Sequence, residues 1–206
     1  MALEQLRIGF DNFSYIIYCQ KSKKAALIDP SVDASKALQF MASKQLTLEY
    51  IILTHYHNDH SLETKRVKQL NPSAQIVSSE HDGKQLGMKP DITVADGSRL
   101  NLGTLTLDFL ITPGHTPGGI CIIVDNKALL TGDTLFIGDC GRTDLPGGSL
   151  EQMYETLHEK ILRLPDDLIV YPGHDYGDKP FDTLGNQKRT NKTLRAKTLK
   201  EFSMIP

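Results

Sequence analysis

Cysteine is scarce in this sequence, and its few copies are widely spaced. The chain has three cysteines, Cys19, Cys121 and Cys140. An odd number of distant cysteines does not make the disulfide framework of a small secreted domain. We therefore expect reduced thiols and a cytoplasmic location.

Long apolar runs are missing as well. No run of apolar residues exceeds five, whereas a membrane-spanning helix needs about 20. Glu4 and Gln5 stand where a signal peptide requires a continuous apolar segment. The sequence therefore predicts neither a membrane span nor export.

An excess of charge of one sign is also absent. The chain has 23 Lys and Arg against 25 Asp and Glu, which gives a net charge of -2. This balance creates no overall field that would attract nucleic acid or an anionic membrane. The basic stretch QKRTNKTLRAK has no aromatic residue on which a base could stack, so we interpret it as a solvated helix face. We predict no nucleic-acid partner.

Internal repeats, low-complexity tracts and Gly/Ser linkers are absent too, so residues 1–206 are expected to form one domain. Short apolar runs rich in β-formers predict strands at 13–19, 25–28, 50–53, 75–77, 105–111, 120–124, 128–130 and 168–171. Helical spacing predicts helices over 34–42, from the histidine-rich segment to residue 70, from Ser149 to Pro165, and from about Thr183 onward. This mixed order predicts two sheets with helices outside them.

The densest group of functional side chains is the segment THYHNDH, residues 54–60. Three of the seven histidines of the chain fall in it, directly after the apolar run YIIL. The alternative is that histidines cluster by chance or pack singly. However, basic and acidic groups folded together need a cation that accepts the imidazole lone pairs and neutralises the carboxylate. We therefore predict a metal site formed by His55, His57, Asp59 and His60.

Three further segments place a potential metal ligand at the end of an apolar run. These are ITPGHTPGG with His115, LLTGD with Asp133, and VYPGH with His174. Pro and Gly end a strand and let the backbone turn, so that the next side chain projects from the sheet edge. Each segment alone is more typical of an ordinary surface turn, but together with THYHNDH they predict one shared metal cleft.

This set of motifs resembles the metallo-β-lactamase superfamily, whose pattern is HxHxDH, a His in a PGHTPG-like turn, an Asp in a GD turn and a distal His. All four blocks occur here in that order and cover nearly the whole chain. The resemblance implies an α+β fold, a four-layer αββα sandwich with the metal cleft at one edge of two sheets. It also implies that Asp29 is a partner of one of the metal ligands.

The resemblance further implies two divalent metal ions, zinc in our prediction. His55, His57 and His115 would hold the first, Asp59, His60 and His174 the second, and Asp133 would bridge them. Two such ions activate water and clamp the oxygens of a reacting acyl group. We therefore expect a hydrolase of thioester, ester or lactone substrates, in which Asp59 also orients the attacking hydroxide. A homo-oligomer stays open.

Within the superfamily, the stretch GDCGRTDLPGG is similar to the branch of hydroxyacylglutathione hydrolases (glyoxalase II) and persulfide dioxygenases. In that branch a cationic residue after Cys-Gly binds a carboxylate of a glutathione-type substrate, which would be Arg142 here. The equal alternative is a structural arginine paired with Asp139 or Asp144. Tyr176 is a further candidate for substrate contact because it closely follows His174.

The alternative function is that of a persulfide dioxygenase with one Fe(II). The resemblance would then assign the iron to His55, His115 and Asp133, a set of two histidines and one carboxylate that suits Fe(II) and dioxygen. Of the remaining candidates, Cys140 is interpreted as a structural residue, although it could be a nucleophile. His81 and His158 are expected to face solvent.

Overall fold

A computed structural model describes residues 1–205, which form two six-stranded β-sheets. The strands of the first sheet stand in chain order: β1 (Ala2–Ile8), β2 (Asn12–Tyr18), β3 (Lys24–Ile28), β4 (Thr47–Ile52), β5 (Gln75–Ser79) and β6 (Ile92–Val94). The second sheet has the spatial order β12 (Asp182–Thr183), β11 (Ile169–Pro172), β10 (Ala128–Gly132), β9 (Ile120–Val124), β8 (Leu105–Ile111) and β7 (Arg99–Leu102).

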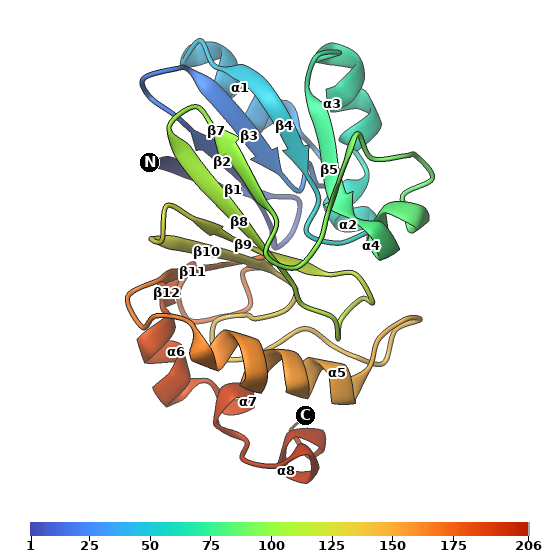
Figure 1. The fold of residues 1–206 in the computed structure, drawn as a ribbon, viewed down its shortest axis with the longest axis vertical. Helices are drawn as coiled ribbons and strands as arrows, with labels where there is room; N and C mark the ends of the chain where they lie inside the picture. Colours follow the sequence, from blue (N-terminus) through green and yellow to red (C-terminus); the bar gives the residue numbers. More distant parts are fainter. Residues whose placement is uncertain (206) are drawn as a thin grey trace.

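The helices divide between the two halves of the chain. Those of the N-terminal half are α1 (Ser35–Ser43), α2 (Asn58–Ser61), α3 (Thr64–Leu70) and α4 (Glu80–Gln85). Those of the C-terminal half are α5 (Leu150–Glu155), α6 (Leu184–Thr190), α7 (Lys192–Arg195) and α8 (Leu199–Ser203). Figure 1 shows α1 and α3 outside the first sheet and α5 to α8 outside the second.

Three apolar clusters hold these four layers together. One lies between the two sheets and includes Ile17, Ile52, Phe109 and Leu130. A second joins the first sheet to α1 and α3, and a third joins the second sheet to α5 to α8. This arrangement confirms the expected αββα sandwich, because each sheet buries apolar side chains on both faces.

The strand directions bring several strand ends to one edge of the sandwich. β3 and β4 are parallel neighbours, and so are β10 and β11. β8 and β10 are both antiparallel to β9 and therefore run in the same direction. As a result, residues that follow β8, β10 and β11 emerge together, beside those that follow β3 and β4.

All eight strands predicted from the sequence are present with small shifts at their ends, but β1, β6, β7 and β12 were not predicted. β1 and β12 are edge strands, and most side chains of β1 are only half-buried. Such strands lack the continuous apolar run of a central strand, so periodicity gives little sign of them.

The predicted helix ends were wrong in two places. The helix expected from the histidine motif to residue 70 is two helices, α2 and α3, because the N–H of Glu63 donates to the carbonyls of Pro30 and Ser31 across a break. The last helix is three short ones. Asn191 caps α7 by accepting from the N–H groups of Thr193 and Leu194, which starts a new helix there.

The helix expected from Ser149 is confirmed at its start. The Ser149 side chain accepts a hydrogen bond from the N–H of Gln152. The helix continues beyond α5 as a π-helical turn (Thr156–Lys160) and a 3-10 turn (Ile161–Arg163) before Pro165. Met153, Leu157 and Ile161 are fully buried against the second sheet, as their spacing predicted.

Candidate metal centre

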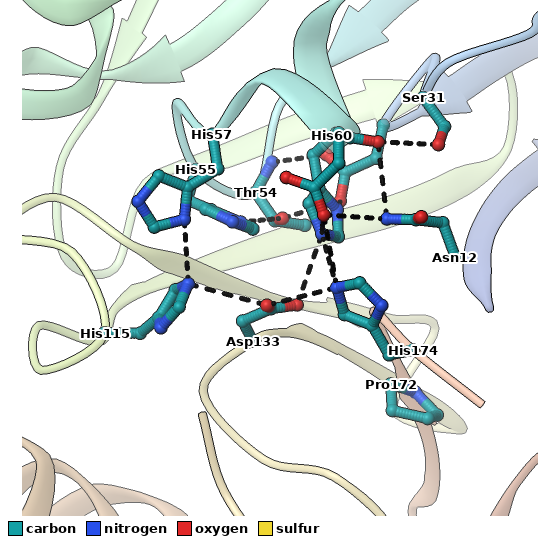
Figure 2. A network of polar contacts seen from close by, with 12 residues as sticks. Asn12, Ser31, Thr54, His55, His57, His60, His115, Asp133, Pro172 and His174 are labelled. Atoms are coloured by element: carbon teal, nitrogen blue, oxygen red, sulfur yellow. Dashed lines mark hydrogen bonds and ion pairs between the residues drawn. The ribbon is translucent and has the colours of Figure 1, made fainter. Parts of the chain in front are cut away.

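The predicted ligands converge from both sheets at the edge where these strand ends meet. His55 follows β4, His57 precedes α2, and Asp59 and His60 lie in α2. From the second sheet, His115 lies between β8 and β9, Asp133 follows β10, and His174 follows β11. Figure 2 shows the side chains of the five histidines and Asp133 pointing toward one another.

Two of the resulting groups have ligand atoms close enough to hold one ion each. In His55, His57 and His115, one nitrogen per residue lies within 4.8 Å of the others. The same limit holds for Asp59, His60 and His174. These are the two triads that the sequence resemblance implied, so the fold brings together residues that are up to 119 positions apart, from His55 to His174.

Asp133 lies between the two triads. Its Oδ2 is 3.5 Å from Nε2 of His115 and 3.4 Å from Nε2 of His174. Its Oδ1 is 3.4 Å from Nε2 of His60. One carboxylate therefore reaches a member of each triad, which is the position that a bridging ligand requires.

Asp29 and Thr54 fix the orientation of two imidazoles. Asp29 accepts hydrogen bonds from the N–H and the hydroxyl of Thr54, at 2.7 and 2.6 Å, and from Nδ1 of His60 at 3.1 Å. Because the Thr54 hydroxyl proton goes to Asp29, its oxygen accepts from Nδ1 of His55 at 3.1 Å. Both histidines thus carry their proton on Nδ1 and present an Nε2 lone pair to the centre.

His115 and His174 are held in the same way. Nδ1 of His115 donates to the carbonyl of Arg142 at 2.8 Å, and Nδ1 of His174 faces the carboxylate of Asp11 at 3.1 Å. Their Nε2 lone pairs therefore also point inward. In each case the partner of Nδ1 decides the tautomer.

The inward lone pairs meet one another at short range. Nε2 of His60 is 3.1 Å from Nε2 of His174, and Nε2 of His115 is 2.9 Å from Nδ1 of His57. The buried Nε2 of His55 and Oδ1 of Asp133 have no hydrogen-bond partner among the described residues. Facing lone pairs and unpaired buried acceptors are costly unless a cation lies between them, so this donor set fits a metal ion.

The charges of the site agree with this conclusion. Burial by itself raises the pKa of Asp133, but the surrounding imidazoles, His60 first, hold that pKa well below its usual range. Burial lowers the pKa of His55. Burial also disfavours the charged form of His174, yet its hydrogen bonds to Asp133 and Asp59 raise its pKa to about 10. The carboxylates thus favour a positive charge at the centre. Without a metal this charge is a proton on His174, and a bound metal ion takes the place of that proton.

Two glycines allow the strand ends to approach this closely. Gly132 has a φ of +46°, and a Cβ there would lie 2.5 Å from the hydroxyl oxygen of Thr54. A Cβ on Gly173 would lie 2.2 Å from Oδ1 of Asp133 and 2.9 Å from Cε1 of His60. No larger residue fits at either position without moving a predicted ligand or its partner.

Several residues of the site were not found from the sequence. Asp11 faces His174, and the Asn12 amide donates to Oδ2 of Asp59 at 3.0 Å. Ser31 donates to the carbonyl of Asp59 at 2.6 Å. These side chains lie between 28 and 163 positions from their partners. No local motif signals such contacts.

The substrate candidates lie at the rim. Arg142 forms a two-pronged ion pair with Asp144, at 2.7 and 2.6 Å, so it adopts the structural pairing that the sequence left open. Its side chain remains 63% exposed and can exchange this partner for another carboxylate. The Tyr176 ring stacks on His174 with centroids 4.6 Å apart and is 56% exposed.

The remaining candidates have mixed outcomes. Cys140 is half-buried, and burial together with Asp139 raises its thiol pKa to about 12, which favours the structural interpretation. His81 is exposed as expected. The prediction for His158 was wrong: it is half-buried, stacks on Tyr154, and contacts the carbonyls of Tyr154 and Ala196 at 2.9 and 2.7 Å.

Within residues 1–205, no helix has both the length and the apolar character needed to cross a bilayer. The cytoplasmic location and the one-domain division stay predictions.

Known proteins are similar to this chain in sequence. The family described as the Metallo-beta-lactamase superfamily matches residues 7–174. The human mitochondrial persulfide dioxygenase ETHE1 is 35% identical over 184 residues, which are 88% of this chain and 71% of that protein. The hydroxyacylglutathione hydrolase of Francisella tularensis subsp. novicida is 35% identical over 167 residues, 80% of this chain and 63% of that protein.

A solved structure is similar over the whole chain. The crystal structure of ETHE1 from Myxococcus xanthus has a TM-score of 0.90 and 30% sequence identity, and the likeness covers 100% of this chain and 92% of that one. The family match spans most of the residues and ends at His174, the last of the predicted ligands. The chain therefore belongs to the metallo-β-lactamase superfamily.

Proposed function

We propose that this protein is an iron-dependent dioxygenase that oxidises the terminal sulfur of a small-molecule persulfide. The observation that carries the proposal is the combination of His55, His115 and Asp133 in one buried site with similarity to persulfide dioxygenases over 88% of the chain. The sequence motifs ranked hydrolysis first. The order is reversed here because similarity to dioxygenases covers more of the chain, and of the relative, than similarity to hydroxyacylglutathione hydrolase.

Iron would be held by His55 Nε2, His115 Nε2 and the Asp133 carboxylate. Two histidines and one carboxylate leave coordination positions open, and iron held in this way supplies the binding and activation of dioxygen. Among the seven predicted ligands, only His55 Nε2 and Asp133 Oδ1 are buried atoms without a hydrogen-bond partner in the described residues, and both belong to this set. That coincidence favours these residues as the essential site.

The polar atoms of the second triad, Asp59, His60 and His174, find more hydrogen-bond partners within the protein. His60 donates to Asp29, His174 faces Asp11, and Asp59 accepts from Asn12. A shared proton between the facing nitrogens of His60 and His174 would complete the chain of hydrogen bonds. The second triad therefore does not require a metal in the way that the first one does.

The surrounding residues would orient the reactants. The backbone carbonyl of Arg142 holds His115, and the Arg142 side chain at the rim would bind a carboxylate of the thiol carrier after leaving Asp144. Tyr176 would donate a hydrogen bond from the same rim. The overall change is R–S–SH + O₂ + H₂O to R–SH + SO₃²⁻ + 2 H⁺, in which the terminal sulfur is oxidised and O₂ is reduced.

The experiment is to purify the full chain without added metal, measure its metals, and assay two reactions. We expect about one iron per chain, oxygen consumption with glutathione persulfide, and sulfite as the product. Hydrolysis of a glutathione thioester or a lactone should be absent. Two zinc ions per chain, thioester or lactone hydrolysis and no oxygen uptake would refute the dioxygenase.

Hydrolysis remains the second candidate because Asp59, His60 and His174 form a complete second triad. With two ions, this centre would activate water and stabilise a tetrahedral oxyanion. Replacing His174 with Ala separates the two functions. A dioxygenase that uses only the first site should keep its iron, whereas a two-metal hydrolase should lose its activity.

A further inference from the structure

A buried carboxylate outside both triads connects the two loops that carry the first triad. Asp82 lies in α4, is 1% exposed, and belongs to none of the groups of described residues whose atoms could hold an ion together. Its Oδ2 accepts from the N–H of Tyr56 at 3.2 Å and from the Thr116 hydroxyl at 2.7 Å. Its Oδ1 accepts from the N–H of Gly118 at 2.7 Å.

The partners of Asp82 flank the predicted ligands in both sheets. Tyr56 stands between His55 and His57, after a strand of the first sheet. Thr116 and Gly118 belong to the turn that carries His115, after a strand of the second sheet. One carboxylate thus bonds directly to both loops, and no other carboxylate in residues 1–205 accepts hydrogen bonds from both.

The turn is held from a second side by Ser79, the last residue of β5 and the N-cap of α4. Ser79 donates to the carbonyl of Gly118 at 2.5 Å. A Cβ on Gly118 would lie 2.4 Å from the Ser79 hydroxyl oxygen and 2.6 Å from Oδ1 of Asp82. The N–H of Gly118 is therefore bonded to Asp82 and its carbonyl to Ser79. As a result, the turn has little freedom to shift relative to the first sheet.

We propose that Asp82 is a positioning residue of the metal centre, which sets the separation of His55 and His57 from His115. All three of its neighbours donate hydrogen bonds, and both of its oxygens are used. An amide in its place offers only one oxygen, and its NH₂ group would face a donor. The inference rests on metal binding by the first triad, but not on whether the reaction is dioxygenation or hydrolysis.

The test compares four variants of the full chain. They are Asp82→Asn, Thr116→Val, which removes only one of the three bonds, the double variant with both of these changes, and Asp91→Asn as a control. Asp91 also accepts from a backbone N–H, that of Ile76, and from Lys68. It precedes β6, however, at the opposite end of the parallel strands from the ligands. Each metal-free variant is titrated with Co²⁺ and with Fe²⁺. The dissociation constant and the visible absorption spectrum of the Co²⁺ form are recorded.

We expect Asp82→Asn to raise the dissociation constant roughly 10- to 100-fold, which is the usual effect of mutating residues that support metal ligands. The Co²⁺ spectrum should change as well. Thr116→Val should raise it less, and the double variant should resemble Asp82→Asn because the lost partner is shared. Asp91→Asn should leave both unchanged. An Asp82→Asn protein with the dissociation constant and spectrum of the wild type or of Asp91→Asn would overturn the proposal.

If Asp82→Asn does not fold, Thr116→Val decides the question, and an unchanged constant and spectrum in that variant would then overturn it. Failure of the wild-type chain to bind either ion would refute the proposed function itself. The two failures are therefore distinguishable.

Discussion

At the scale of single residues, the centre depends on which atoms of each imidazole remain free. Four histidines each have Nδ1 occupied by a neighbouring group. Thr54 contacts His55, Asp29 contacts His60, the carbonyl of Arg142 contacts His115, and Asp11 contacts His174. The other nitrogen is thereby left as an inward lone pair. Asp133 supplies the negative charge between these lone pairs, and it contacts members of both triads.

Replacing Asp133 with Ala should therefore abolish metal binding. The variant loses the carboxylate that offsets the cation charge in a buried site, where an uncompensated charge is costly. We expect metal content near zero after dialysis, measured by elemental analysis, with the secondary structure retained by circular dichroism. Full metal occupancy in a folded Asp133→Ala protein would contradict the assignment of this residue.

His174 gives a contrasting prediction. It contacts Asp133, Asp59 and His60, but not the unpaired nitrogen of His55. His174→Ala should thus retain about one iron per chain, together with oxygen consumption. Loss of all metal in this variant would show that the two triads bind only as a pair.

Cys140 should be chemically inert. Burial, with Asp139 beside it, raises the thiol pKa to about 12, so at pH 8 only about one thiol in 10⁴ is the reactive thiolate. We expect slow alkylation by iodoacetamide in the folded protein and fast alkylation after unfolding, followed by mass spectrometry. Cys140→Ala should keep its activity, which a nucleophilic cysteine could not do.

At the scale of elements, the site depends on how closely strand ends and their turns approach. β11 ends at Pro172, whose carbonyl accepts a hydrogen bond from Tyr15 of the first sheet. Gly173 then passes against Asp133 and His60 with no room for a Cβ. The two sheets are thus joined just before His174 turns toward the centre. Figure 2 shows Pro172 and His174 at this position.

Gly173→Ala should disturb the metal centre specifically. The added Cβ would displace Asp133 or His60, so we expect at least about a tenfold weaker metal affinity, as for other changes that misplace ligands. Gly87→Ala is the matched control, because Gly87 has a φ of +60° and a Cβ there would meet nothing within 4 Å. Because a residue with a Cβ is strained at positive φ, that change should lower the free energy of unfolding by about 1 kcal/mol. The metal affinity should be unchanged. Titration and thermal unfolding measure the two effects.

At the scale of the whole molecule, each triad takes ligands from both sheets. His55 and His57 follow the first sheet, whereas His115 follows the second; the same division separates Asp59 and His60 from His174. A bound ion therefore links the two halves of the sandwich. Its binding energy becomes part of the stability of the whole fold.

Removal of metal should accordingly lower the unfolding temperature. With free metal at 100 times the dissociation constant, binding contributes about 2.7 kcal/mol to the free energy of unfolding. For a chain of this size, that corresponds to a decrease of roughly 5 to 10 °C when a chelator is added. Differential scanning calorimetry measures the shift, and Asp133→Ala should show none on chelation.

The buried strands and the predicted ligands could be identified from the sequence because their signals are local. Apolar runs mark the central strands, and His115, Asp133 and His174 each follow such a run within a few residues. Edge strands such as β1 and β12 gave no such signal. The breaks after α2 and α6 depend on contacts of Glu63 and Asn191 with their surroundings, and these had no clear signal in the helical periodicity.

By itself, the sequence determined which side chains can bind a metal and that His55, His115, Asp133 and His174 each follow a strand, because side-chain chemistry and hydrophobic periodicity are written in neighbouring residues. Only the tertiary structure decided which of them face one another, which nitrogen of each imidazole is free, and that Asp11, Asn12 and Asp82 contact the predicted ligands or the loops that carry them. Those properties arise from contacts between segments that are brought together by the pairing and stacking of two sheets, and no short stretch of sequence contains them.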